Sequence, residues 1–113
     1  MNINTDFATE ALLEFHYEDT SISVTVTDGD DILILKQILN GRSYFRDGLH
    51  CGFTTAISVT MTNGKKSIMF CPANDGCQLL RIGTSNRYIE ISLEDRARLN
   101  EVLEKYGMTF PCV

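Results

Sequence analysis

The fold is decided by a stretch near the middle of the chain, residues 56–71, which reads AISVTMTNGKKSIMFC. Apolar and polar side chains alternate from Ala56 to Thr62, a period of two that is typical of a strand with one buried face. A second alternating run, Ser67–Cys71, follows the pair Asn63-Gly64, which favours a hairpin because both residues tolerate positive φ. The stretch therefore predicts two neighbouring antiparallel strands.

Further strands are predicted on both sides of this hairpin. Leu79–Ile82 and Arg87–Ile91 follow it, and residues 83–86 between them read as a turn. Ser21–Thr27 precedes the hairpin and alternates regularly between aliphatic and hydroxyl side chains. Leu12–Tyr17 is interpreted as another strand, although the end of a short helix is the alternative interpretation.

Two helices are predicted from apolar periodicity and capping residues. Asp28 is expected to cap the first, residues 29–40, with Asp31 at the reach-back position of a capping box. Ser92 is expected to cap the second, residues 93–106. Their apolar stripes have helical spacing and consist of Ile32, Leu35, Ile38 and Leu39 in the first helix and Leu99, Val102, Leu103 and Tyr106 in the second.

These elements predict an α+β fold in one domain, residues 1–113, with residues 1–10 loosely ordered. We expect an antiparallel meander of about five to six strands, with both helices packed on one face, because strands in series flanked by helices favour that layering. The other face is expected to be solvated and to offer a candidate binding surface. The residues assigned to it are Ser58, Thr60, Ser67, Arg81 and Glu90.

Charge and hydropathy exclude several classes of function. Acidic residues outnumber basic ones, 15 to 10, and the net charge is −5. Nucleic acids and anionic membranes are therefore not expected partners, because both attract clustered Lys and Arg. On the second helix, Glu101 and Lys105 are expected to form a surface pair. The longest apolar run, Ile32–Leu35, is too short to span a bilayer, and residues 1–10 lack the features of a secretory signal, so a cytoplasmic location is predicted.

The cysteines are the chemically suggestive feature. Cys51, Cys71, Cys77 and Cys112, together with His50, could provide ligands for a structural zinc ion. The spacing does not demand a metal, because five residues separate Cys71 from Cys77 and the other cysteines are isolated. Free thiols are the expectation in a reducing compartment, and a Cys71–Cys77 disulfide is the alternative if the protein is exported.

No sequence pattern of a known cysteine enzyme, phosphate loop or nucleophile elbow is found, so we assign no catalytic residue and an enzyme is not the favoured interpretation. The first hypothesis is a small non-enzymatic module that binds a protein or a ligand, either on the polar sheet face or through the irregular segment Arg42–Gly52. An acidic immunity or inhibitor protein that opposes a basic partner would be one example. The second hypothesis is a cysteine-centred function, either zinc binding or thiol redox chemistry. The sequence predicts no oligomeric state.

Overall fold

A computed structural model describes residues 2–17, 19–45, 57–72 and 78–108. The strands are β1 (Asn2–Ile3), β2 (Glu10–Tyr17), β3 (Thr20–Val26), β4 (Gly41–Arg42), β5 (Tyr44–Phe45), β6 (Ile57–Thr62), β7 (Ser67–Pro72), β8 (Leu79–Ile82) and β9 (Arg87–Glu90). The helices are α1 (Gly29–Ile38) and α2 (Leu93–Lys105).

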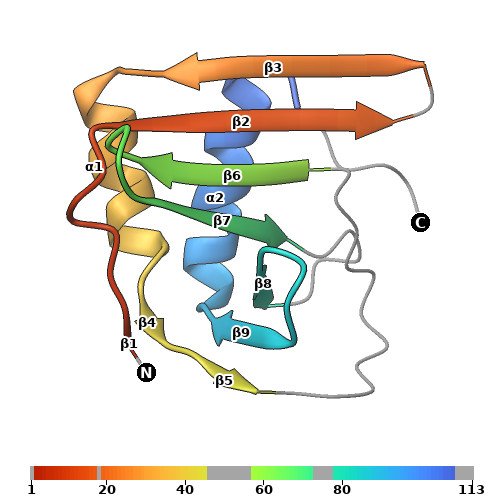
Figure 1. Cartoon of the computed structure of the whole chain (residues 1–113). Coiled ribbons are helices and arrows are strands. Elements are labelled where there is room, and N and C mark those ends of the chain that lie inside the picture. The colour runs from red at the N-terminus through yellow and green to blue at the C-terminus, as the bar shows by residue number, and fades with distance from the viewer. Residues whose placement is uncertain (1, 18, 46–56, 73–77, 109–113) are drawn as a thin grey trace.

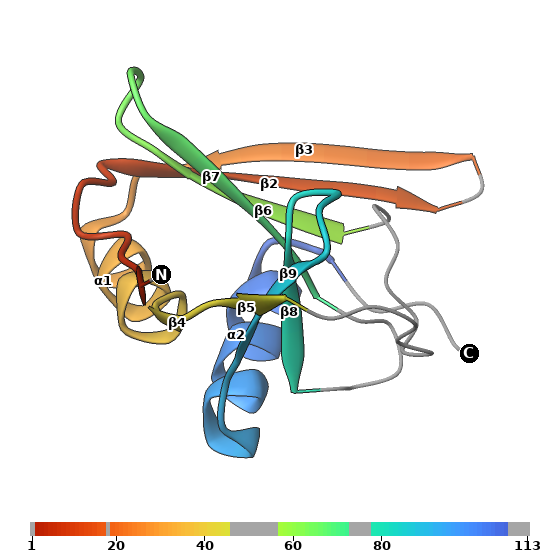
Figure 2. The same cartoon turned by 60° about the horizontal axis from the view of Figure 1, so that its bottom comes forward.

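Seven of these nine strands form one sheet with the order β3-β2-β6-β7-β8-β9-β5 (Figure 1), and β1 and β4 form a separate two-stranded sheet. All neighbouring strands in it are antiparallel. Both helices lie on the same side of this sheet (Figure 2), which confirms the predicted α+β fold. The sheet has more strands than predicted because β5 is only two residues long, and so short a strand carries no readable period.

The central hairpin forms as predicted, with a longer connection than a tight two-residue turn. Thr62 pairs with Ser67, so residues 63–66 form the loop. The side-chain oxygen of Asn63 accepts hydrogen bonds from the backbone N–H groups of Lys65 and Lys66, at 2.9 and 2.8 Å. Gly64 has a φ of 88°, a conformation that favours glycine. The Asn63 side chain therefore closes the loop that the sequence predicted.

Both predicted helix caps are confirmed. The Asp28 carboxylate accepts hydrogen bonds from the backbone N–H groups of Asp30 and Asp31 at the start of α1. The Ser92 hydroxyl accepts one from the N–H of Asp95 at the start of α2, at 3.0 Å. These bonds satisfy N–H groups that a helix leaves unpaired in its first turn.

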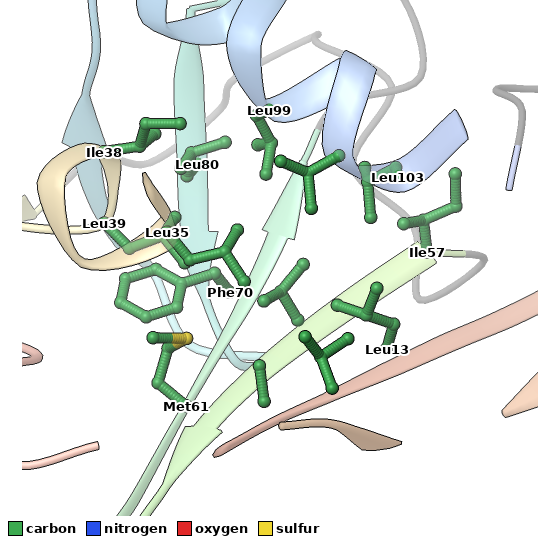
Figure 3. Close-up of a cluster of buried hydrophobic side chains, with 14 of the residues drawn as sticks. Leu13, Leu35, Ile38, Leu39, Ile57, Met61, Phe70, Leu80, Leu99 and Leu103 are labelled. Carbon is green, nitrogen blue, oxygen red and sulfur yellow. The ribbon is translucent and has the colours of Figure 1, made fainter. Parts of the chain in front are cut away.

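The core lies between the helices and the inward-facing residues of the sheet. Every predicted inward residue of β6 is buried, and Phe70 of β7 is fully buried between the two layers. Figure 3 shows the Phe70 ring among side chains that include Leu35 of α1 and Met61 of β6. The helices run antiparallel, since the first turn of α1 contacts the end of α2 through Asp31 and Lys105, and Gln37 contacts Arg98.

The N-terminal segment is more regular than the sequence suggested. β1 pairs with β4, which immediately follows α1. The Thr5 hydroxyl is buried and donates a hydrogen bond to the carbonyl of Leu39, at 3.0 Å. Residues 2–8 are therefore held against the end of α1, through contacts that are distant in sequence. Neither described helix is long and apolar enough to cross a membrane.

Candidate functional site

The face of the sheet that points away from the helices is the candidate site, and we call it the outer face. Along β2, the residues Ala11, Leu13 and Phe15 belong to the core, so the alternate residues of β2 and of its ladder partners point outward. Residues paired across neighbouring strands point to the same face, so the alternation of β2 can be followed through the whole sheet. The residues of the outer face are Glu10, Leu12, Glu14, His16, Ser21, Ser23, Thr25, Ser58, Thr60, Thr62, Ser67, Met69, Cys71, Leu79, Arg81, Tyr88 and Glu90.

The part of the outer face formed by β2 and β3 is open and polar. We call it the open half, and its residues are Glu10, Leu12, Glu14, His16, Ser21, Ser23 and Thr25. His16, Ser21, Ser23 and Thr25 are exposed. This set contains Glu10 and Glu14 and no Lys or Arg, so the open half is acidic. A polar, acidic and uncovered sheet face is suited to binding.

Glu14, His16 and Ser21 form a small cluster on the open half. The Ser21 hydroxyl oxygen lies 2.9 Å from Nδ1 of His16, and Nε2 of His16 lies 3.8 Å from a carboxylate oxygen of Glu14. The same three residue types carry acyl transfer in many hydrolases. Here the carboxylate is beyond hydrogen-bond reach of the ring, and the His16 side chain is 55% exposed. The cluster therefore supports surface recognition better than catalysis.

The outer face of β6 to β9 differs from the prediction. The sequence placed Ser58 on a solvated face, but Ser58 is only 5% exposed. Cys71 and Tyr88, which also point to the outer face, are buried as well. The prediction was therefore wrong for Ser58, whereas Ser67 and Glu90 are exposed as expected. Alternation predicts which face a side chain points to, but it does not predict whether that face is covered.

Cys71 is the one predicted metal ligand that the structure describes. It is opposite Arg81 in the β7–β8 ladder and is fully buried. Burial raises the pKa of the Cys71 thiol, and the nearby Arg81 guanidinium offsets part of that rise through its charge and a hydrogen bond. A thiol with a raised pKa stays protonated at neutral pH and is a poor nucleophile. Cys71 therefore behaves as a buried apolar side chain rather than as a reactive one.

The other predicted ligands, His50, Cys51, Cys77 and Cys112, lie outside the described residues. Within the described ranges, no three His, Cys, Asp or Glu side chains are placed to hold a metal ion.

A polar groove of about 480 Å³ lies beside the β1–β4 ladder. It is lined by Asn2, Ile3, Asn4, Asp6, Asn40, Gly41 and Arg42. Two of its amides already hold the backbone, because Asn40 donates to the carbonyls of Lys36 and Gln37 and Asn4 accepts from the N–H of Asp6. The groove can accommodate a small polar group, but much of its hydrogen-bonding capacity is used within the protein.

A further polar cluster joins the two helices and was not predicted. Asp31 accepts hydrogen bonds from Lys105 and from the hydroxyl of Tyr106. The hydrogen bond from Tyr106, followed by that from Lys105, holds the pKa of the Asp31 carboxyl below its usual value of 3.8. The sequence analysis placed Asp31 in the capping box of the first helix and paired Lys105 with Glu101. In the structure, Lys105 contacts Asp31 instead. A carboxylate held ionised by two donors stabilises structure and is not poised as an acid.

Comparison with known proteins gives no relative. No family model matches the chain, and neither the curated proteins nor the solved structures include a significant match to it.

Proposed function

We propose that the protein is a non-enzymatic binding module that holds a protein partner on the open half of its outer face. The observation that supports this most is the layering of the fold. Both helices lie on the other face of the sheet (Figure 2), while His16, Ser21, Ser23 and Thr25 on the outer face of β2 and β3 are exposed. The proposal includes a cytoplasmic location, where thiols stay reduced.

Charge favours a basic partner. The open half carries Glu10 and Glu14 and no Lys or Arg, and the whole chain has a net charge of −5. Complementary charge speeds association and discriminates against wrong partners. An immunity protein or inhibitor that opposes a basic protein would fit this description. A nucleic-acid-binding protein would not, because it would need a basic surface of its own to bind phosphates.

The proposal can be tested by site-specific crosslinking in the cells from which the protein comes. A photo-crosslinking residue at Ser23 lies on the open half, and the same residue at Glu101 lies on the exposed side of α2. We expect one protein to be captured from position 23 and not from position 101. Glu14→Lys should weaken that capture, whereas Glu101→Lys, which makes the same change of charge elsewhere, should not. Equal capture from both positions, or none from position 23, would exclude this surface.

The cysteine-centred function is the second candidate. It rests on the four cysteines and His50 of the sequence, of which the structure describes Cys71, buried in β7 opposite Arg81. Intact mass spectrometry under native and denaturing conditions, with and without a thiol-alkylating reagent, tests this candidate. Added native mass equal to a metal ion, with thiols protected until denaturation, would favour zinc. An unchanged native mass, with every thiol except that of buried Cys71 readily alkylated, would exclude bound zinc.

A further inference from the structure

The two edges of the seven-stranded sheet differ in length and chemistry. One edge is β5, which is two residues long. The other edge is β3, seven residues that read TSISVTV and contain no charged residue, proline or glycine. An edge strand leaves alternate N–H and C=O groups unpaired, and proteins usually protect such edges with charges, proline, bulges or short length. Within the described residues, β3 has none of these protections.

The inward side of β3 also leaves apolar surface at the rim of the core. Ile22 and Val24 pack against the core cluster but stay partly exposed, whereas Val26 is buried. A strand added beside β3 would cover both side chains and pair the free backbone groups. The edge therefore offers hydrogen bonds and apolar contact to an extended segment that is itself neutral and alternating.

A second copy of β3 meets these requirements. A two-fold axis perpendicular to the sheet would keep the helices of both copies on one side, so inward residues must pair with inward residues. With the axis at Ser23, Ile22 of one copy lies opposite Val24 of the other, and Ser21 lies opposite Thr25. Cross-strand pairs of β-branched side chains, and of hydroxyl side chains, are favourable. The sequence of β3 is thus complementary to itself in this register.

We propose that the protein forms a symmetric dimer by antiparallel pairing of β3 with β3 of a second copy, which joins the two sheets into one. This inference does not depend on the proposed function, because the pairing uses the backbone edge of β3 and its inward side chains Ile22 and Val24, whereas the proposed partner binds the outward side chains of β2 and β3. A single strand from each copy makes a small interface, below the roughly 1,200 Å² of stable complexes. We therefore expect a dimer that forms and dissociates with concentration.

The charges at the ends of β3 give the dimer a distinctive dependence on salt. Asp19 precedes the strand and Asp28 follows it. Antiparallel pairing brings Asp19 of one copy opposite Thr27 of the other, next to Asp28. Salt screens repulsion between like charges at the surface. Dimerisation should therefore strengthen with ionic strength, whereas binding of a basic partner to the acidic open half should weaken.

Sedimentation velocity of the full chain, from low to high micromolar concentration, tests the proposal. We expect a shift from monomer to dimer that is more complete at high salt. Val24→Lys should abolish the shift, because pairing would bury the new charge between the sheet and the helices. Thr25→Lys adds the same charge to the open outer face and should leave the dimer largely intact. A wild-type protein that stays monomeric throughout would overturn the proposal.

A crosslinking experiment checks the register even if Val24→Lys fails to fold. Ser23→Cys would place two thiols opposite each other across the axis, at a Cα separation of about 5 Å, which suits a disulfide. Ser21 of one copy lies four residues along the strand from Ser21 of the other, so Ser21→Cys would place its thiols about 13 Å apart. Under a mild oxidant we expect a covalent dimer from Ser23→Cys well above the level of wild-type protein and of Ser21→Cys. Equal crosslinking of both variants would overturn this pairing.

Discussion

Lys105 Nζ lies 2.9 Å from a carboxylate oxygen of Asp31, an ion pair that joins the last turn of α2 to the first turn of α1. The neighbouring Tyr106 hydroxyl donates to the same oxygen. Asp31 is 5% exposed, so its charge is taken out of water and is compensated by these two donors. This cluster links the first turn of α1 to the end of α2 beside the core.

Replacing Asp31 by alanine should destabilise the fold, because the Lys105 and Tyr106 donors would lose their shared acceptor. We expect the free energy of unfolding to fall by about 1.5–3 kcal/mol, the usual range for a hydrogen bond to a charged group. Asp30→Ala is a matched control, since Asp30 has the same charge, lies in the same turn and is exposed. Urea denaturation followed by circular dichroism measures both losses. Equal losses would mean that the cluster adds nothing beyond the helix dipole.

The same cluster predicts a pH dependence of stability. The pKa of Asp31 is lowered in the folded protein, first by the Tyr106 hydrogen bond and then by Lys105. A lowered folded-state pKa gives stability that is present above the unfolded value, near 3.8, and is lost as pH falls through the folded value. The advantage of wild type over Asp31→Asn should therefore be full at neutral pH and should shrink below about pH 4.

At alkaline pH the stability given by this cluster is lost as pH rises, rather than as pH falls. The hydrogen bond to Asp31 raises the pKa of both Lys105 and Tyr106. Raised folded-state values give stability that is present below the unfolded values of 10.5 and 10.0 and is lost above them. Melting temperatures of wild type and Asp31→Asn across the pH range would measure the loss of stability at acid pH and at alkaline pH. Curves that stay parallel at every pH would contradict the assignment.

Most of the fold could be predicted because it depends on local patterns. The alternation of Ala56–Thr62 and the capping residues Asp28 and Ser92 act within a few residues, so they can be read from the chain. The Asp31–Lys105 pair joins residues 74 apart and has no local signal. The two-residue strands β1, β4 and β5 are also set by distant partners.

The candidate site was predictable only in part. Alternation correctly placed Ser67 and Glu90 on the exposed outer face, but it could not show that Ser58 is covered. Burial depends on what packs over a residue, and this is a property of the whole chain. The predicted zinc ligands illustrate the same limit, because a ligand set needs convergence in space as well as suitable residue types. That prediction remains one for mass spectrometry to decide.

The thiol of Cys71 should react slowly in the folded protein. A variant with serine at positions 51, 77 and 112 isolates this thiol. Its raised pKa and its burial both reduce the accessible thiolate, so we expect alkylation at least about ten times slower than in denaturant. Arg81→Ala should slow the folded-state reaction further, since Arg81 lowers the pKa of the thiol. Rapid alkylation of the folded variant would show that Cys71 is reactive.

Adjacent residues of β7 should tolerate truncation very differently, because they point to opposite faces of the sheet. Phe70 is fully buried in the core, whereas Met69 points to the outer face and is partly exposed. Phe70→Ala should lower the free energy of unfolding by about 3–5 kcal/mol, from lost apolar burial and from the cavity left behind. Met69→Ala removes a side chain of similar reach and should cost about 1 kcal/mol or less, because solvent already contacts it.

If Phe70→Ala does not fold, Phe70→Leu keeps the comparison measurable, with an expected loss of about 1–2 kcal/mol. Chemical denaturation of the three variants would give these values. A larger loss for Met69→Ala than for Phe70→Leu would mean that the outer face of β7 contributes as much to the core as the inner face.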